Sequence, residues 1–348
     1  MDESKKVEGR MNGLVWAAAG LGGLLLARAL VRRVREFNFA GKSVLITGGS
    51  RGLGLVLARE LVGRGARVAI CARDREELER ARIDLRGRGA GDVLAFPCDV
   101  TDRAQVQELV RLCQDRFGGI DVLINNAGVI QVGPVEVMTV EDYEEAMRTH
   151  FWGPLYTTLA VLPEMRRRRA GRIVNISSIG GKIGVPHLVP YSASKFALVG
   201  LSEGLRAELA KDGIVVTTVC PGLMRTGSPR NATFKGQHRA EYAWFSISDA
   251  LPVSAIGAER AARRIIDGCA RGEAEVIVSL QAVLAVKFHA LFPELTADMM
   301  SLMNRLLPDA GGIGTQSAKG KESQSAFSPS LLTTLSDAAA RRNNEMAH

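Results

Sequence analysis

The fold is decided by the stretch SVLITGGSRGLG, residues 43–54. An apolar run of strand length, residues 43–47, leads into a turn with glycines at positions 48, 49, 52 and 54, and an apolar helical pattern follows. Glycines allow a sharp turn and a close approach to a pyrophosphate, and the N-terminus of a helix favours negative charge. The stretch therefore predicts a nucleotide-binding unit, although an ordinary tight turn can contain the same glycines.

Beyond this unit, short apolar strands alternate with amphipathic helices, which is typical of a parallel sheet covered on both faces. We expect an α/β, doubly wound Rossmann fold with a seven-stranded parallel sheet, in a catalytic domain spanning residues 39–280. Long helices are expected over residues 140–165 and 191–211. The strands are predicted at residues 43–47, 67–72, 93–97, 122–124, 172–177, 215–219 and 274–278.

Residues 1–35 combine a polar start with an apolar segment and an arginine cluster. Residues 11–27 contain no charge and would span ~26 Å as a helix, or ~31 Å if extended to residue 31. Arg32, Arg33 and Arg35 follow, and such clusters stay on the cytoplasmic side. We expect a single-pass anchor, with the catalytic domain facing the cytoplasm at a bacterial inner membrane. A helix packed on the domain or on a partner, and a cleaved signal peptide, are the two alternatives.

The C-terminal end holds the other residues beyond the expected domain. Residues 281–307 are rich in apolar side chains and predict a pair of helices that extends the domain. Residues 308–348 are rich in Gly, Ser, Ala and Lys, a composition that predicts a disordered tail.

Composition argues against a nucleic-acid partner and against a metal site. The net charge is +8, but only 5% of the residues are aromatic, whereas nucleic-acid surfaces usually combine both features. Part of the positive charge lies beside the apolar N-terminal segment and in the arginine run at 166–169. The five cysteines include no C-x-x-C pair, so we expect no zinc site.

Further motifs follow the glycine-rich turn in a definite order. Together they resemble the single-domain branch of the short-chain dehydrogenase/reductase family, over about residues 41–278. Each motif alone is modest evidence, but the complete set at this spacing is specific. The matching residues are Thr47, Gly48, Gly52 and Gly54 in the turn, Asn125, Asn126, Ala127 and Gly128 after the fourth strand, then Ser178, Tyr191 and Lys195, and finally Pro221, Gly222 and Thr226.

The resemblance implies a nicotinamide cofactor site. In the family, the pair matching Asp99 and Val100 contacts adenine, Lys195 binds the nicotinamide ribose, and a hydroxyl at the position of Thr226 often holds the nicotinamide amide. The expected cofactor-binding residues are Gly48, Ser50, Arg51, Gly52, Leu53, Gly54, Arg73, Asp99, Val100, Asn126, Ala127, Gly128, Tyr191, Lys195, Pro221, Gly222 and Thr226.

Two arginines favour NADP(H). NAD-binding members of such folds usually place an acid at the end of the second strand, where this chain has Ala72 followed by Arg73. Arg51 lies within the glycine-rich turn, and two guanidinium groups suit a 2′-phosphate. The alternative is that Arg73 lies at a surface turn and Asp74 binds the ribose.

Ser178, Tyr191 and Lys195 predict carbonyl–alcohol chemistry. Tyr191 and Lys195 are four residues apart and share one face of a helix. A free tyrosine has a pKa of about 10, and a neighbouring ammonium group would lower it. Ser178 can donate a hydrogen bond to the carbonyl oxygen while Tyr191 transfers the proton.

His150 departs from the family pattern, because an asparagine often stands at this position as the fourth catalytic residue. In the family this asparagine is associated with a proton-relay water, largely through its backbone carbonyl. The histidine side chain could relay protons, since its unperturbed pKa is near 6.5. It could equally be a tolerated change in a helix.

These residues predict an NADP(H)-dependent oxidoreductase that interconverts a ketone or aldehyde with an alcohol. Aromatic residues at 234, 242, 244 and 245, together with residues 187–189, suggest an apolar pocket and so a hydrophobic substrate. The anchored, NADP-preferring pattern resembles family members that act on steroids, retinoids or long-chain keto-lipids, and the resemblance implies a lipid-, steroid- or retinoid-like substrate. The alternative is a non-catalytic NADP(H)-sensing or scaffold protein on the same fold. The resemblance also implies a homodimer or homotetramer.

Overall fold

The computed structural model describes residues 36–89, 92–250, 255–325 and 334–346, and also Trp16, Gly20, Gly22 and Gly23. Apart from these four positions, the predicted N-terminal anchor lies outside the described residues. Among the described residues, no helix is both long enough and apolar enough to cross a membrane.

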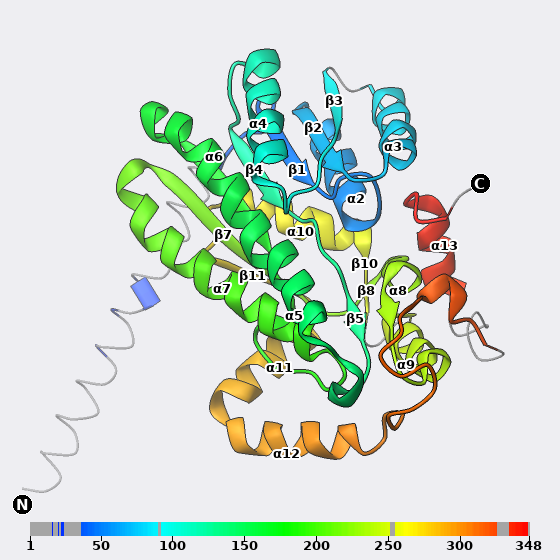
Figure 1. Ribbon diagram of the computed structural model, residues 1–348. Coiled ribbons are helices and arrows are strands. Elements are labelled where there is room, and N and C mark those ends of the chain that lie inside the picture. The colour runs from blue at the N-terminus through cyan, green and yellow to red at the C-terminus, as the bar shows by residue number, and fades with distance from the viewer. Residues whose placement is uncertain are drawn as a thin grey trace, which may run out of the picture.

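The centre of the molecule is a seven-stranded, fully parallel sheet, which confirms the predicted fold (Figure 1). The strand order is β11-β7-β6-β4-β1-β2-β3, so the order reverses between β1 and β4. In such sheets ligands bind where the order reverses, beyond the carboxyl ends of the strands. The strands are β1 (Ser43–Thr47), β2 (Arg67–Ala72), β3 (Val93–Pro97), β4 (Val122–Asn125), β6 (Gly171–Ile176), β7 (Ile214–Pro221) and β11 (Glu275–Val278).

Helices cover both faces of the sheet and enclose two apolar cores. One core packs α2, α3 and α10 against the sheet, and the other packs α4, α6 and the end of α7 against the opposite face. This arrangement leaves the carboxyl edge of the sheet open for a site. The helices are α2 (Gly52–Gly63), α3 (Arg75–Gly87), α4 (Arg103–Phe117), α6 (Gly153–Arg168), α7 (Val189–Leu209) and α10 (Ala258–Ala270).

The helix predicted over residues 140–165 is interrupted in the structure. It consists of α5 (Val140–Met147), a five-residue π-helical turn (Arg148–Trp152) and α6. Pro154 lacks a backbone N–H and removes one rung of the α-helical ladder just beyond this turn. The π-helical turn contains His150, which lies at the carboxyl edge of the sheet. π-Helical turns often occur at functional sites.

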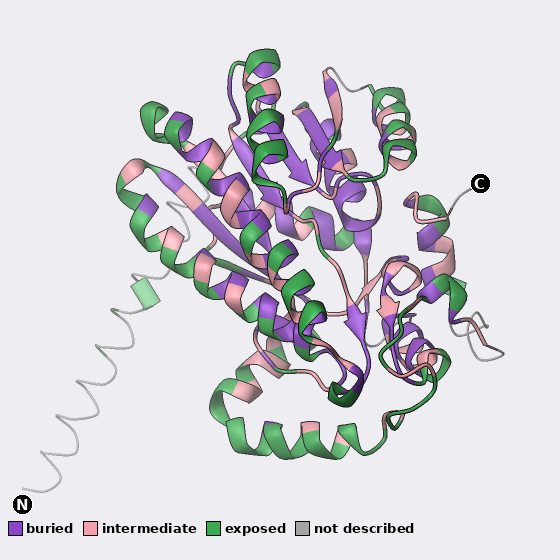
Figure 2. Ribbon diagram, in the orientation of Figure 1, coloured by how far each residue is buried: buried purple, intermediate pink, exposed green. Residues whose placement is uncertain are grey.

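The C-terminal region has more structure than its composition predicts. The expected helical pair is α11 (Leu280–Leu291) and α12 (Pro293–Asn304), and α12 is largely exposed (Figure 2). Residues 308–348, expected to be disordered, include β12 (Ala318–Lys319) and α13 (Thr334–Arg342). β12 extends a small sheet with β9 (Thr233–Phe234) and β5 (Gln131–Val132). Tertiary partners order these polar residues, and composition alone contains no information about such partners.

Candidate active site

A cavity of ≈ 460 Å³ lies at the carboxyl edge of the sheet. It brings together every predicted site residue except Thr226. The hydroxyl of Thr226 lies 2.7 Å from the Ser228 hydroxyl instead, and Ser228 lines the cavity. The predicted residues that line the cavity are Gly48, Ser50, Arg51, Gly52, Leu53, Gly54, Arg73, Asp99, Val100, Asn126, Ala127, Gly128, His150, Ser178, Tyr191, Lys195, Pro221 and Gly222.

The glycine-rich loop is held close to the end of β4. Gly48 has φ +63°, and a Cβ atom there would lie 2.8 Å from the Cα of Ala127. A Cβ atom on Gly54 would collide with the carbonyl oxygen of Gly48. The Asn126 side chain donates hydrogen bonds to the carbonyl oxygens of Thr47 (3.1 Å) and Gly48 (3.0 Å). Asn126 therefore shapes the loop from the neighbouring strand.

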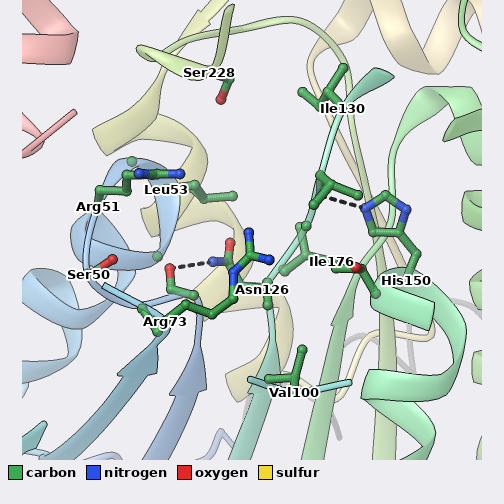
Figure 3. Close-up of a pocket in the computed structure, with 18 of the residues that line it drawn as sticks. Ser50, Arg51, Leu53, Arg73, Val100, Asn126, Ile130, His150, Ile176 and Ser228 are labelled. Atoms are coloured by element: carbon green, nitrogen blue, oxygen red, sulfur yellow. Dashed lines mark hydrogen bonds between the residues drawn. The ribbon is translucent and has the colours of Figure 1, made fainter. Parts of the chain in front are cut away.

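The two arginines predicted to bind phosphate have different surroundings. Arg51 forms an ion pair of 2.5 Å with Glu77, which also accepts a hydrogen bond of 3.1 Å from Ser50. Arg73 is exposed and has no ion-pair partner within the described part of the chain. Figure 3 shows both guanidinium groups on one side of the cavity and His150 on the other. Sequence reasoning missed Glu77, because an acid in the first turn of a helix is an ordinary dipole partner.

Tyr191 stands at the start of α7 and faces Ser178. Burial raises the pKa of Tyr191 to about 12, although a hydrogen bond to Ser178 acts in the opposite direction. The sequence predicts that a lysine ammonium lowers this pKa, and the structure differs. Burial lowers the pKa of Lys195 to about 7. Its Nζ donates to the carbonyl oxygen of Ile176 (2.9 Å) and lies 5.6 Å from the centroid of the Tyr191 ring.

His150 is fully buried and has hydrogen-bond partners at both ring nitrogens. Its Nε2 accepts from the backbone N–H of Val129 (3.1 Å), and its Nδ1 lies 2.8 Å from the Ser194 hydroxyl. Ser194 donates its proton to the carbonyl oxygen of Tyr191 (2.8 Å), so Nδ1 carries the proton toward Ser194. Burial and the charge of Lys195 hold the pKa of His150 well below its usual value. This geometry makes His150 a neutral tether, and a relay through its side chain requires breaking one of these bonds.

The predicted aromatic pocket is a separate apolar cluster. Phe234, Tyr242 and Phe245 are buried in one cluster with Leu188, and Trp244 packs against it. None of these four aromatic residues lines the cavity, whose apolar lining includes Val129, Ile130 and Met224. The aromatic rings of Phe234, Tyr242, Trp244 and Phe245 pack edge to face on one another instead.

His187 lies against Trp244 of this cluster, between Ser178 and Tyr191 in the sequence. It has a positive φ of 60°, and its Nδ1 lies 2.7 Å from the buried Glu241. Glu241 in turn accepts a hydrogen bond of 2.6 Å from Trp244. The cluster is thus held by hydrogen bonds to the buried Glu241 as well as by its aromatic contacts.

The family model described as short chain dehydrogenase matches residues 42–235, more than half of the chain. The chain belongs to the short-chain dehydrogenase family. It is an oxidoreductase that acts on CH–OH or ketone groups. The matched region contains the glycine-rich loop, His150, Ser178, Tyr191 and Lys195, but it ends before the C-terminal helices.

Curated relatives include keto-group reductases. This dehydrogenase is 44% identical over 184 residues to granaticin polyketide synthase putative ketoacyl reductase 1 of Streptomyces violaceoruber, covering 52% of this chain and 67% of the relative. It is 34% identical over 215 residues to the 3-ketodihydrosphingosine reductase of Mus musculus, covering 60% of this chain and 65% of the relative.

Solved structures of similar chains contain either nicotinamide cofactor. A variant of actinorhodin polyketide ketoreductase with NADPH is 33% identical, with a TM-score of 0.61, and the match covers 70% of this chain and 97% of that one. A short chain dehydrogenase/reductase from Burkholderia phymatum in complex with NAD is 26% identical, with a TM-score of 0.68, and the match covers 74% and 96%. A nicotinamide cofactor is therefore a family property, and the choice between the two depends on this chain's own residues.

Proposed function

We propose that this dehydrogenase is an NADP(H)-dependent carbonyl reductase for a hydrophobic substrate and is held at a membrane by its N-terminal segment. One observation carries the proposal. Ser178, Tyr191 and Lys195 line the same cavity as the glycine-rich loop. A proton donor and a nucleotide cradle in one cavity are the two parts that hydride chemistry on a carbonyl needs.

The residues present fit a dinucleotide. Backbone crowding at Gly48 and Gly54 leaves no room for side chains between the loop and β4, which is the cradle a pyrophosphate needs. The loop would hold the phosphates, Asp99 and Val100 the adenine, and Lys195 the ribose. Arg73 has no other ion-pair partner within the described part of the chain and would join Arg51 at a 2′-phosphate. When bound, the nicotinamide supplies or accepts the hydride.

The catalytic side chains are arranged for reduction. With a pKa of about 12, Tyr191 is protonated near neutral pH and can give its proton to a carbonyl oxygen. The Ser178 hydroxyl can donate a second hydrogen bond to the same oxygen and orient it. Lys195 has a pKa of about 7, and its protonated ammonium group can stabilise the resulting phenolate. His150 fixes the backbone of Tyr191 through Ser194.

The substrate class follows from the cavity wall and from the relatives. Val129, Ile130 and Met224 line the same cavity as Tyr191 and give it apolar surface. One relative is named for a ketoacyl group and another for 3-ketodihydrosphingosine, and both names describe a keto group. A keto-lipid, a keto-acyl chain, a steroid or a retinoid is the expected type of substrate.

Membrane attachment places the enzyme where such substrates dissolve. The proposal rests on the uncharged residues 11–27 and on the arginines that follow them. Carbonate extraction of membranes, with the full chain and with a chain lacking residues 1–31, tests it. We expect only the full chain to stay in the membrane pellet, and equal release of both chains would contradict anchoring.

The catalytic proposal is tested by Tyr191→Phe with a panel of keto-acyl thioesters, ketosphingoid bases and ketosteroids. Loss of the proton donor should lower kcat by about 10³-fold, while NADPH still binds. Tyr156→Phe, on α6 and outside the cavity, is the matched control and should stay near wild type. Unchanged turnover in Tyr191→Phe would overturn the mechanism. NADPH binding without turnover of any substrate by the wild type would indicate a cofactor-sensing protein instead.

A further inference from the structure

A segment near the C-terminal end of the described residues lies against the glycine-rich loop, although almost 300 positions separate the two in the sequence. We call residues 334–345 the C-terminal strap: they comprise α13 and the three residues after it. Ala339 and Ala340 of α13 are buried, and the helix packs on α9 (His238–Ala250) and on β8 (Met224–Arg225) (Figure 1). This packing delivers Asn343, Asn344 and Glu345 to the rim of the cofactor cavity.

Asn343 engages the start of α2. Its carbonyl oxygen accepts a hydrogen bond of 2.9 Å from the backbone N–H of Gly52, the first residue of the helix. Arg59 donates to the side chain of Asn343 (2.9 Å) and to the carbonyl oxygen of Arg342 (3.0 Å). N–H groups at a helix start are the donors that bind phosphate. The strap thus uses one of the loop's own anion-binding donors.

Asn344 bridges the glycine-rich loop and α3. Its amide nitrogen donates to the carbonyl oxygens of Ser50 (2.8 Å) and Glu77 (2.9 Å), and its oxygen accepts from Arg80 (2.8 Å). The residue has φ +60°, a conformation that asparagine tolerates better than most residues. One side chain therefore satisfies three groups in a geometry that suits its residue type.

Glu345 lies between Gly52 of the glycine-rich loop and Gly227 of the loop after β8. It lines the cavity, and its carboxylate accepts a hydrogen bond from the backbone N–H of Gly227, in the loop after β8. A Cβ atom built on Gly52 would lie only 3.1 Å from Oε1 of Glu345. The space beside Gly52 is therefore filled, and an ionised Glu345 would also repel a phosphate there.

We propose that the C-terminal strap is autoinhibitory: residues 343–345 compete with the dinucleotide for the glycine-rich loop, and cofactor binding requires their release. This inference rests on the proposed function, because it assumes that the loop binds NADP(H). If the strap is docked about 90% of the time, the apparent affinity for cofactor falls about tenfold. Changes in strap contacts that leave the loop intact should restore that affinity.

The test compares NADPH and NADH dissociation constants, measured by cofactor fluorescence, in full-length variants. Asn344→Ala removes all three side-chain hydrogen bonds of Asn344, and Asn344→Asp keeps its shape but turns two donated bonds into oxygen–oxygen repulsion. Asn304→Ala, an exposed position at the end of α12, is the matched control. We expect both Asn344 variants to bind NADPH about tenfold more tightly, and the control to match wild type.

Trypsin gives a second readout that does not depend on activity. Arg341 and Arg342 are exposed, and the carbonyl of Arg342 is held by Arg59 while the strap is docked. Saturating NADPH should speed cleavage after these arginines if it displaces the strap. Slower cleavage, together with weaker NADPH binding by the Asn344 variants, would make the strap part of the cofactor site and overturn the proposal.

The remaining outcomes separate the strap from the cofactor assignment. If NADH binds and NADPH does not, the proposed cofactor is wrong, and the strap is judged by the same comparison with NADH. If neither dinucleotide binds to any variant, both proposals fail. Equal affinities in wild type and in both Asn344 variants would refute autoinhibition alone.

Discussion

The two ends of the cofactor cavity are built from different kinds of contact. At the chemical end, Ser178, Tyr191 and Lys195 come from two neighbouring elements within the region that matches the family model. At the phosphate end, the glycine-rich loop is contacted by Glu77, which lies within that region, and by Asn343–Glu345, which lie beyond it. The chemistry is thus a property of the family domain, whereas access to the cavity depends on this chain's own C-terminus.

The largest effect expected at the phosphate end is the loss of NADPH affinity in Arg73→Asp. The change removes an exposed guanidinium from the expected 2′-phosphate site and adds a like charge, so NADPH affinity should fall about 10–100-fold while NADH affinity changes little. Isothermal titration with both cofactors measures the two affinities. Arg75→Asp, two residues further at the start of α3, is the control. Equal NADPH affinity in the Arg73 variant would exclude the proposed cofactor contact.

The chemical end has a pH signature of its own. The pKa of Lys195 is lowered to about 7, so its ammonium is present below pH 7 and is lost above it, while Tyr191 stays protonated until about pH 12. The rate of ketone reduction, as kcat/KM, should therefore fall about tenfold per pH unit above pH 7.5. Lys195→Arg keeps its charge and should flatten this profile at a lower rate. A flat wild-type profile from pH 6 to 9 would contradict the role of Lys195.

Variants of His150 test whether this residue positions Tyr191 or relays protons at the chemical end. His150→Ala loses the contacts to Val129 and Ser194, so kcat should fall about fivefold with little change in KM. His150→Asn should recover part of the loss. Because the buried imidazole is neutral, the pH profile between 5 and 8 should keep its shape in both variants. A changed shape would show that the side chain relays protons.

The smallest expected effect belongs to Glu345. Burial raises the pKa of Glu345 to about 7. The charge of Glu77 also raises this pKa, whereas the charges of Arg51 and Arg230 lower it. Burial raises the pKa of Asp249, on α9, to about 8, and the charge of Glu345 acts in the same direction. A docked strap therefore holds the proton of Glu345 more tightly than a free carboxyl does. This contribution to docking is complete below about pH 4.5 and is lost as pH rises through 7.

Glu345→Gln keeps a neutral side chain at every pH, so at pH 8 its strap should dock more tightly than the ionised wild type. NADPH should then bind about threefold more weakly to this variant at pH 8, with no difference at pH 5. Fluorescence titration at the two pH values measures this. Glu294→Gln, an exposed acid on α12, is the matched control. Tighter binding by Glu345→Gln at pH 8 would show that electrostatic repulsion by Glu345, rather than docking of the strap, limits affinity.

Much of the chemical end was predictable from sequence. Strand alternation predicts the sheet, and the four-residue spacing of Tyr191 and Lys195 places both on one helix face. The pKa of Tyr191 was not predictable, because it depends on burial and on where the Nζ of Lys195 lies. The position of the aromatic residues 234, 242, 244 and 245 was not predictable either, since an apolar side chain can face a cavity or a core with the same sequence pattern.

The sequence alone determined the fold and predicted which residues gather in the cavity, because both depend on local periodicity and short spacings. Only the tertiary structure placed Asn344 against Ser50, a pair separated by 294 positions. Only the tertiary structure showed that His150 has a hydrogen-bond partner at each ring nitrogen. Contacts between distant segments depend on how whole elements pack, and a polar tail has no periodic signal that reveals its partner. The structure therefore placed the C-terminal strap on the glycine-rich loop, where its residues fill the space beside Gly52.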